Sequence, residues 1–460
     1  MRTFDHIIFG TGQATGTLLG GLLKTGESIG IIEGGKIGGS CVNIGCTPTK
    51  TLVASARVAH MIRRGPEYGI HADNLSVNFG EVMARMNMVR GNSRNGLEGW
   101  ITSLDQVTLM RGWGQFVGPK QIRVGDEVVE GKNIYINVGT RPRKSDMEGL
   151  DAVPWMDSGR LLELDKLPEH LIIMGGSYIG LEFGQAFRRF GSKVTIIEHN
   201  SRLIKREDED VSQAVTEILE KEGIHVATNV SACCVEQTAD GGVRVFEDRE
   251  GGQSFTGSHL LLGIGRVPAT DRLGLENAGI ETTERGHIKI DDYCRTNVDG
   301  VFALGDVNGH GAFTHTSVND AEVVLDLMNG GTRKVSDRIL TYALFIDPAL
   351  GRVGMTEAQA VAKGYNVLKA VRPMSKISRA KEMGETQGFA KLLVDADTDL
   401  LLGATILGPG GDEIINMFTP LMYNKITYKE YRKTVLVHPT ISELMPWTLD
   451  GLKPVESVTS

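Results

Sequence analysis

The stretch GGSCVNIGCTPTK, from Gly38 to Lys50, places two cysteines five positions apart at a glycine-rich turn. An apolar, alanine-rich run with helical character follows it. Five residues of regular helix rise about 7.5 Å, whereas a disulfide joins Cα atoms roughly 4.4–6.8 Å apart. A disulfide between Cys41 and Cys46 therefore needs irregular backbone, which the three glycines allow. Because thiols near a helix N-terminus have a lowered pKa, we expect a reactive pair rather than two structural cysteines.

Composition limits the classes of function. The chain has 460 residues, 41% hydrophobic and 23% charged, which predicts a soluble globular protein of about three domains. Its net charge of −8, without a basic block, argues against nucleic acid as a partner. No apolar run approaches the roughly 20 residues of a membrane span, and the N-terminus lacks the form of a signal peptide. Five cysteines do not make a disulfide scaffold, so we expect a cytoplasmic protein with a catalytic pair and no metal site.

The N-terminal residues predict a dinucleotide site. An apolar strand, His6–Phe9, is followed by a glycine turn, Gly10–Gly16, and a helical run, Thr17–Lys24. Such a turn lets a pyrophosphate approach the helix N-terminus. A second strand, Ser28–Ile32, leads to a carboxylate that can accept hydrogen bonds from a ribose. The residues assigned to this site are Gly10, Gly12, Thr15, which stands in the third glycine position, and Glu33.

The same plan occurs a second time. The strand Leu171–Met174 precedes the turn Gly175–Gly180, and the strand Lys193–Ile197 ends at Glu198. Gly10 and Glu33 are 23 positions apart, as are Gly175 and Glu198, so we expect two dinucleotides. The residues assigned to the second site are Gly175, Ser177, which replaces the central glycine, Ile179, Gly180 and Glu198.

Glu198 bears on the choice of nicotinamide coenzyme. A carboxylate at this strand end bonds a ribose 2′-hydroxyl and repels a 2′-phosphate, which favours NADH. Arg202, Lys205 and Arg206 follow closely and could neutralise it or bind a phosphate. Their alternative interpretation is a solvated cluster at the start of a helix.

The segment Cys41–Lys50 resembles the redox-active segment of the class I pyridine nucleotide-disulfide oxidoreductases. These FAD enzymes include dihydrolipoamide dehydrogenase, glutathione reductase and mercuric reductase, and the resemblance extends over essentially the whole chain. It implies an α/β fold with two Rossmann-like dinucleotide-binding domains and a C-terminal α+β dimerisation domain. The expected boundaries are 1–150 and 269–335 for the FAD domain, 151–268 for the NAD(P) domain and 336–460 for dimerisation.

The resemblance also implies further cofactor contacts. The segments Asn137–Pro142 and Thr296–Asp306 resemble flavin-binding segments of the family, and Leu262–Pro268 resembles the segment that closes the nicotinamide domain. Tyr178 is expected over the nicotinamide pocket or, alternatively, packed on the sheet. The cofactor residues implied in this way are Gly39, Ser40, Lys50, Gly139, Thr140, Gly265, Gly305, Asp306 and Tyr178.

Four catalytic roles follow from the resemblance. Cys46 corresponds to the cysteine nearest the flavin, and Cys41 to the one that attacks the substrate. Glu182 resembles the glutamate that pairs with the lysine of the redox segment, here Lys50, since a buried lysine needs a partner. In a homodimer, the His438-Pro-Thr motif would reach the dithiol of the partner subunit, with Glu443 orienting the imidazole.

These features predict an FAD-dependent oxidoreductase that passes electrons from NAD(P)H through FAD and Cys41–Cys46 to a small disulfide or another oxidised substrate. Alternatives are a dihydrolipoamide dehydrogenase and a redox sensor without turnover. Phe313–Ser317 and Arg379–Gly384 resemble mercuric reductases, but a C-terminal cysteine pair is lacking. Leu436 stands where dihydrolipoamide dehydrogenases usually have a histidine. Adjacent Cys233 and Cys234 are expected to pack in a strand.

Overall fold

The N-terminal third and a later strand build a seven-stranded sheet in this computed structural model, which describes residues 1–455. Its strands are β1 (Arg2–Phe9), β2 (Ile29–Glu33), β3 (Val107–Arg111), β4 (Gly114–Gly118), β5 (Gln121–Val124), β6 (Glu127–Ile136) and β17 (Val301–Ala303). Their order is β3-β2-β1-β6-β5-β4, with β17 also paired to β6. The pairs among β3, β2, β1, β6 and β17 are parallel, whereas β4 and β5 are antiparallel.

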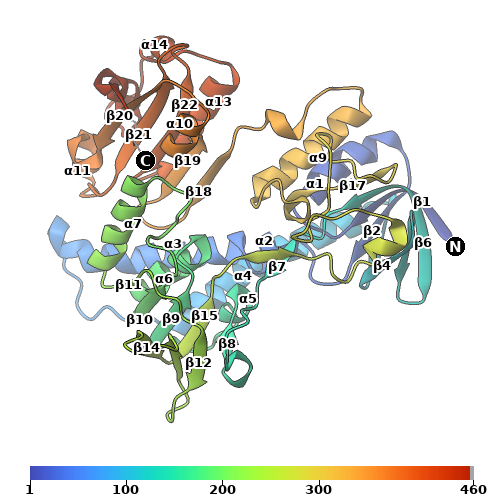
Figure 1. Cartoon of the computed structure of the whole chain (residues 1–460), viewed down its shortest axis with the longest axis horizontal. Coiled ribbons are helices and arrows are strands. Elements are labelled where there is room, and N and C mark those ends of the chain that lie inside the picture. Colours follow the sequence, from blue (N-terminus) through green and yellow to red (C-terminus); the bar gives the residue numbers. More distant parts are fainter. Residues whose placement is uncertain (456–460) are drawn as a thin grey trace.

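Burial of β1 explains why its sequence is a nearly continuous apolar run. Ile7 and Ile8 are fully buried but belong to different core clusters, because successive side chains point to opposite faces of a sheet. Helices α1 (Ala14–Leu22) and α9 (Thr314–Met328) pack together beside this sheet (Figure 1). A parallel sheet covered on both faces needs apolar residues on both.

A second sheet lies in the middle of the chain. It contains β8 (Trp155–Met156), β9 (His170–Met174), β10 (Lys193–Ile197), β11 (His225–Ala227) and β15 (His259–Leu262). All its pairs are parallel, in the order β11-β10-β9-β15-β8. A three-stranded antiparallel sheet adjoins it, with strands β12 (Cys234–Gln237), β13 (Val243–Phe246) and β14 (Ser254–Gly257). The two-stranded sheet of β7 (Thr140–Pro142) and β16 (Arg266–Pro268) joins the two units.

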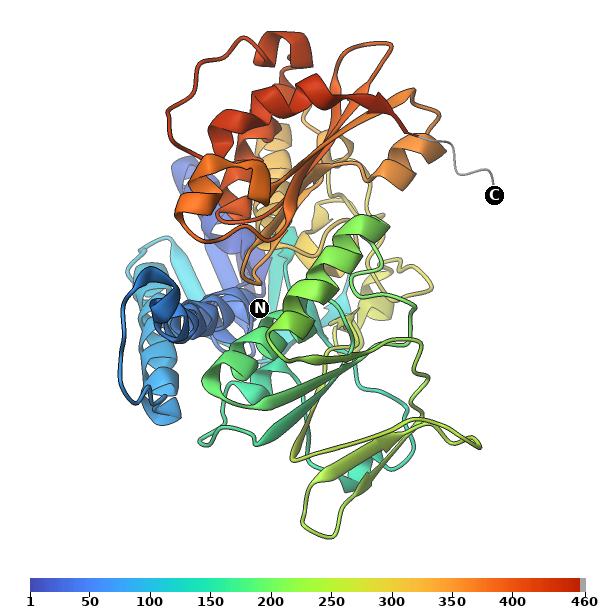
Figure 2. The ribbon, with the colours of Figure 1, turned by 90° about the vertical axis from the view of Figure 1, so that its left-hand side faces the viewer.

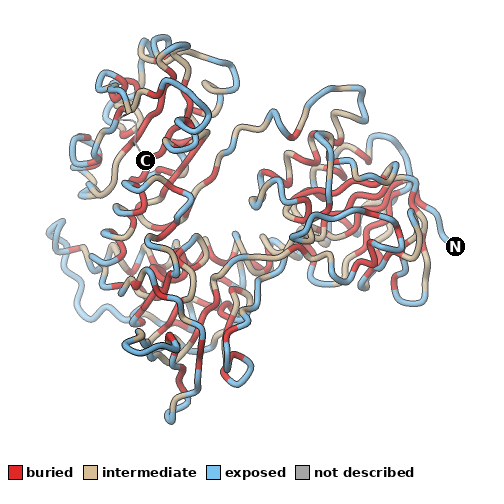
Figure 3. Tube along the Cα trace, viewed as in Figure 1, coloured by how far each residue is buried: buried red, intermediate tan, exposed pale blue. Residues whose placement is uncertain are grey.

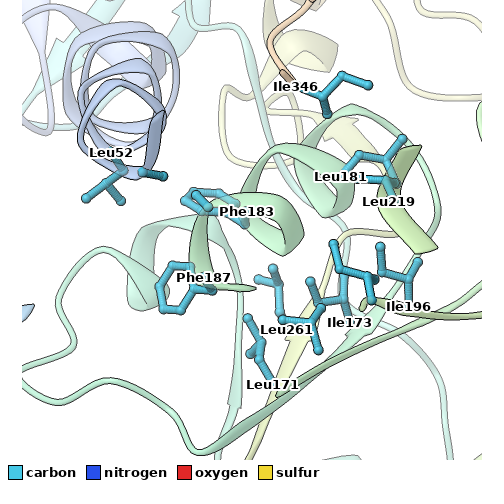
Figure 4. Close-up of a cluster of buried hydrophobic side chains, with 14 of the residues drawn as sticks. Leu52, Leu171, Ile173, Leu181, Phe183, Phe187, Ile196, Leu219, Leu261 and Ile346 are labelled. Atoms are coloured by element: carbon cyan, nitrogen blue, oxygen red, sulfur yellow. The ribbon is translucent and has the colours of Figure 1, made fainter. Parts of the chain in front are cut away.

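The cysteine-bearing helix packs on the second unit. Leu52 of α3 (Cys46–Arg64) shares a core cluster with Phe183 and Phe187 of α6 (Tyr178–Phe190), as Figure 4 shows. Helix α6 also contributes Leu181, and strands β9, β10 and β15 and helix α7 (Glu209–Lys221) contribute the other labelled side chains except Ile346. This shared core fixes the dithiol segment against the second glycine turn.

The C-terminal third forms an antiparallel six-stranded sheet, the upper lobe in Figure 2. Its order is β18 (Thr341–Leu344), β19 (Leu350–Gly354), β22 (Leu401–Leu407), β21 (Phe389–Asp395), β20 (Val367–Pro373) and β23 (Lys453–Pro454). The remaining helices are α2 (Gly39–Asn43), α4 (Phe79–Thr102), α5 (Ser158–Leu161), α8 (Leu275–Ala278), α10 (Glu357–Ala362), α11 (Ser378–Glu382), α12 (Gly411–Ile414), α13 (Phe418–Tyr423), α14 (Tyr428–Tyr431) and α15 (Met445–Thr448). Two parallel dinucleotide-type units and a separate antiparallel unit confirm the predicted fold class.

Buried charges tie the C-terminal sheet to the second unit. Arg352 Nε lies 2.6 Å from Glu207 Oε2, and Lys391 Nζ lies 2.8 Å from Asp208 Oδ2. Arg352 and Lys391 are almost completely buried, so these pairs compensate charges that cannot reach water. In Figure 3, buried residues are concentrated along the strands of the sheets in all three units. Within residues 1–455, no helix is long and apolar enough to cross a membrane.

Candidate active site

The two cysteines lie on either side of a break between helices. Cys41 belongs to the short helix α2, and Cys46 is the first residue of the 19-residue α3. Gly45 between them has φ −130° and ψ −115°, which interrupts the helix. The irregular backbone predicted for this stretch is therefore present, and Cys46 stands at the positive end of a long helix dipole.

Thr314, at the start of α9, contacts both sulfurs of the reduced pair. Its Oγ1 lies 3.1 Å from Cys41 Sγ and 3.5 Å from Cys46 Sγ. The hydrogen bond with Cys41 lowers the pKa of Cys46 to about 6, with smaller contributions from Thr314 and Lys50. The same bond to Cys46, together with burial, raises the pKa of Cys41. At neutral pH the pair therefore carries one thiolate, on Cys46.

Lys50 and Glu182 form the predicted ion pair. Lys50 Nζ lies 2.7 Å and 2.9 Å from the two carboxylate oxygens of Glu182. The backbone N–H of Phe345 donates to Glu182 Oε1 at 3.0 Å, and the Phe345 ring lies 4.5 Å from Lys50 Nζ. A positive charge is thus fixed next to the dithiol.

A cavity of about 1030 Å³ connects these groups with the first glycine turn. Glu33 Oε2 accepts a hydrogen bond from the Thr11 N–H at 2.9 Å. Gly10 has φ +94°, and a Cβ there would lie 2.6 Å from the Asn137 carbonyl oxygen. Glycine is needed at that turn because two backbone segments approach each other closely. The assigned residues Gly10, Gly12, Glu33, Gly39, Ser40, Gly139 and Thr140 all line this cavity.

Two assigned residues of the first site support it from behind. Thr15 is buried and its Oγ1 accepts a hydrogen bond from Asn137 Nδ2 at 3.1 Å. Gly305 has φ +72°, and its N–H donates to Asp320 Oδ2 at 2.8 Å. Both residues hold the loops that carry the cavity-lining groups, and neither lines the cavity among the residues the structure describes.

Asp306 belongs to a polar group that lines the same cavity as the dithiol. Its Oδ2 accepts a hydrogen bond from Thr140 Oγ1 at 3.0 Å, and burial raises its pKa. Arg266 donates to Thr140 Oγ1 at 2.8 Å and to Ser40 Oγ at 3.1 Å. Arg266 therefore links the segment before the cysteines to the segment that carries Thr140.

The second glycine turn is held by Glu198. The N–H of Gly176 donates to Glu198 Oε2 at 2.7 Å, and Asn200 donates to Oε1 through its backbone and side chain. Gly175 has φ +106°, and a Cβ on Gly180 would collide with the Gly175 carbonyl oxygen. Ser177 occupies the N-cap position of α6, ahead of Tyr178 and Ile179, and Gly265 has φ +108° in the adjoining loop.

Of the three basic residues after Glu198, Arg202 is already used by the backbone. Its guanidinium donates to the carbonyl oxygens of Lys205 at 3.4 Å and Glu207 at 3.2 Å. Lys205 Nζ donates to Asn200 Oδ1 at 3.1 Å.

Tyr178 lies in an aromatic cluster that lines the cavity. Its ring is 6.0 Å from that of Phe313 and 5.9 Å from that of Tyr342, both edge-on. The Tyr342 hydroxyl donates to Glu207 Oε1 at 2.6 Å. The Tyr178 ring thus lines the cavity and packs against neighbouring aromatic rings, and its place over a nicotinamide stays a prediction.

His438 and Glu443 are paired with each other, away from the cavity. His438 Nδ1 lies 2.9 Å from Glu443 Oε1, and the His438 side chain is 76% exposed. His438 is not among the described residues that line the cavity with Cys41 and Cys46. Exposed Val435 and Val437 precede it.

Comparison with known protein families matches both parts of this architecture. The family described as pyridine nucleotide-disulphide oxidoreductase matches residues 4–321, and the dimerisation domain of the same family matches residues 340–449. The chain belongs to the class I pyridine nucleotide-disulfide oxidoreductases. FAD and NAD(P)H are typical of this enzyme family.

Individual relatives align over nearly the full chain. The probable pyridine nucleotide-disulfide oxidoreductase RclA of Escherichia coli is 35% identical over 96% of this chain and 98% of its own length. A mercuric reductase of Bacillus cereus is 32% identical over 96% of this chain and 70% of its own. The solved structure of the E. coli protein, described as an HOCl-induced flavoprotein disulfide reductase, superposes with a TM-score of 0.88 at 34% identity, covering 97% of this chain and 98% of that one. A Cu(II) complex of that protein superposes with a TM-score of 0.89, also at 34% identity, covering 98% of this chain and 99% of that one.

The residues of this oxidoreductase fit FAD. The Gly10 turn leaves no room for a side chain, and the Glu33 carboxylate stands at the end of β2, where a ribose is bound in such units. Trp113, 75% exposed, lines the same cavity and packs on Gly34, where an adenine can stack. Sequence reasoning gave no role to Trp113, Thr314 or Arg266, although two of them lie in segments that resemble the family.

Proposed function

We propose that this enzyme transfers electrons from NAD(P)H to a small disulfide or another oxidised substrate through the Cys41–Cys46 pair. The observation that carries the proposal is a dithiol with a lowered Cys46 pKa that lines the cavity together with Lys50 and Asp306. FAD, when bound, supplies two-electron transfer between the nicotinamide coenzyme and the dithiol. The fixed charge of Lys50 would favour negative charge that develops in the cavity.

The thiol chemistry divides between the two cysteines. Because Cys41 keeps its proton beside the Cys46 thiolate, a base must take that proton as Cys41 attacks one sulfur of the substrate disulfide. A mixed disulfide forms, one substrate thiolate leaves, and the base returns the proton to it. The Cys46 thiolate then attacks Cys41 Sγ, which closes the Cys41–Cys46 disulfide and releases the second substrate thiolate. Thr314, within reach of both sulfurs, holds them in position for these exchanges.

The departing thiolates need a proton donor. We assign that role to His438 of the partner subunit in a cytoplasmic homodimer. The exposed position of His438 and its hydrogen bond to Glu443 support the assignment, because the carboxylate fixes the orientation of the ring. In this proposal the FAD domain comprises residues 1–150 and 269–335, and the NAD(P) domain comprises residues 151–268. Residues 336–460 form the dimer interface.

NADH is the proposed coenzyme. The Glu198 carboxylate at the end of β10 would repel a 2′-phosphate. Use of Arg202 by backbone carbonyls leaves fewer cations to bind such a phosphate.

Anaerobic turnover of the FAD-loaded enzyme with NADH tests the proposal. The acceptors compared are small disulfides, lipoamide and Cu(II), the last because a Cu(II) complex of the E. coli relative is known. We expect steady turnover that Cys41→Ser and Cys46→Ser abolish. Rapid flavin reduction without turnover on any acceptor would favour a redox sensor. Faster reaction of NAD⁺ with dihydrolipoamide than of NADH with lipoamide would favour a dihydrolipoamide dehydrogenase.

A further inference from the structure

Cys233 and Cys234 bring two sulfurs together outside the flavin cavity. Their Sγ atoms are 3.1 Å apart. Consecutive residues of a regular strand point to opposite faces, but Cys233 precedes β12, where the backbone is irregular. Both side chains therefore turn toward each other, contrary to the expected packed strand pair. Cys233 is exposed and Cys234 is buried, and neither is a lining residue of the cavity in the described chain.

Hydrogen bonds fix Cys233 at three atoms. Its N–H donates to the Phe246 carbonyl at 3.2 Å, and its carbonyl accepts from the Glu148 N–H at 2.9 Å. The N–H of Asp248 donates to Cys233 Sγ at 3.2 Å, which fixes the position of the sulfur. The hydrogen bond with Cys233 raises the pKa of Cys234 to about 11. The pair thus has one exposed sulfur, on Cys233, and a buried neighbour whose pKa is raised.

Two familiar uses of a cysteine pair fit this geometry poorly. A disulfide joins Cα atoms about 4.4–6.8 Å apart, whereas consecutive Cα atoms are only about 3.8 Å apart. Zinc and similar ions need four ligands, but among residues 1–455 no group of three or more metal-ligating side chains occurs. The site offers two sulfurs and no further protein ligand in that part of the chain.

The distance between the two sulfurs limits the coordination geometry of an atom that both can bind. With bonds of about 2.3 Å, as in metal thiolates, sulfurs 3.1 Å apart subtend an angle of about 85°. A linear two-coordinate ion would need a much larger separation, whereas a pyramidal centre with one further substituent fits. We propose that Cys233 and Cys234 form a chelating site for trivalent arsenicals that carry one organic group.

The binding step is a ligand exchange without oxidation or reduction. The Cys233 thiol attacks arsenic in an organic arsenic(III) oxide, and the Cys234 thiol forms the second bond. Two As–S bonds replace the As–O bonds. The oxygen leaves as water with the two thiol protons, and arsenic stays trivalent.

Phenylarsine oxide tests this site on the full-length, FAD-loaded Cys41→Ser/Cys46→Ser variant, in which the catalytic dithiol cannot compete. We expect one phenylarsine per chain by intact mass and the loss of two titratable thiols. Glutathione should leave the adduct in place and ethanedithiol should remove it. Adding Cys233→Ser should weaken binding by at least about 100-fold, the gain expected from a second tethered contact. The matched control Cys294→Ser, at a lone buried cysteine, should change nothing.

Three results would overturn the proposal. Unchanged binding in the Cys233→Ser variant, with thermal melting showing that it is folded, would place the arsenical elsewhere. Loss of only one thiol per arsenic, or removal by glutathione, would mean single-point attachment. Loss of both thiols without added mass would mean that the pair forms a disulfide instead.

Discussion

Lys50 on α3 and Glu182 on α6 are joined by an ion pair, with Nζ 2.7 Å from Oε2, across the contact between the cysteine helix and the second nucleotide unit. The two side chains differ in exposure, 33% for Lys50 and 6% for Glu182. Glu182 also accepts a hydrogen bond from the N–H of Phe345, which directly follows β18. One carboxylate on α6 therefore contacts both the cysteine helix α3 and the start of the C-terminal sheet. Its charge therefore matters both for stability and for the electrostatics of the cavity.

Replacing Glu182 by glutamine should leave Lys50 without its anion. We expect a loss of about 1 kcal/mol in the free energy of unfolding, since Lys50 is partly exposed and solvent screens the pair. Urea unfolding measures it. The double variant Lys50→Gln/Glu182→Gln should lose less than the sum of the single variants. A control, Lys289→Gln in the exposed pair with Glu281, should cost no more than about 0.5 kcal/mol. Equal losses at both sites would contradict a special role for the buried glutamate.

The reduced holoenzyme should show a long-wavelength absorbance from the Cys46 thiolate beside FAD. The pKa of Cys46 is lowered to about 6, so the thiolate is present above that pH. The absorbance should therefore fade as the pH falls through about 6. Cys46→Ser should abolish it, whereas Cys41→Ser should keep it, because the serine hydroxyl can still donate a hydrogen bond to the Cys46 thiolate. Retention in Cys46→Ser and loss in Cys41→Ser would reverse the assigned roles.

Thr314→Val removes the hydroxyl that contacts both sulfurs while keeping a side chain of similar shape. A hydrogen bond to a charged group is worth roughly 1.5–3 kcal/mol, and 1.36 kcal/mol corresponds to about one pKa unit. We expect the absorbance midpoint to rise by about one pH unit. The matched control Thr332→Val, at an exposed threonine, should leave it unchanged. An unshifted midpoint in Thr314→Val would show that its hydroxyl does not stabilise the thiolate.

Sequence patterns located the local parts of the site better than the groups that complete it. The two strand–turn–helix units and the break between Cys41 and Cys46 follow from glycine spacing, which acts over a few residues. Thr314 reaches the dithiol from 268 positions away in sequence from Cys46, and only the packing of α9 brings it there. Arg266 approaches Ser40 for a similar reason, through the pairing of β16 with β7.

The burial of charged side chains was the other feature that could not be predicted from local sequence patterns. Sequence reasoning gave no role to Arg352 or Lys391, yet both are almost completely buried against acidic residues at the start of α7. A cation becomes buried only when its partner arrives from another unit, and that meeting depends on the whole fold. The vicinal sulfurs of Cys233 and Cys234 likewise depend on contacts with Phe246 and Asp248.

NADH should be preferred over NADPH. The measurement is kcat/KM for flavin reduction with each coenzyme, and we expect at least a tenfold preference, which corresponds to about 1.4 kcal/mol. Such a difference is within reach of one charge contact by Glu198. A variant such as Arg206→Gln should not change the preference if exposed Arg206 does not bind phosphate. A clear preference for NADPH would mean that the basic residues outweigh the carboxylate.

Catalysis should require both subunits, because His438 of one chain is proposed to serve the Cys41–Cys46 pair of the other. In the single chain His438 is exposed and absent from the described lining of the cavity, which motivates the test. Cys41→Ser and His438→Ala should each be inactive with substrate, while His438→Ala keeps fast flavin reduction by NADH. After full subunit exchange between equal amounts, about half of the dimers are mixed, and each has one site with both faults and one with neither. Activity should therefore recover to roughly a quarter of wild type if the sites act independently. No recovery, with exchange demonstrated by differently tagged chains, would place histidine and dithiol in the same subunit.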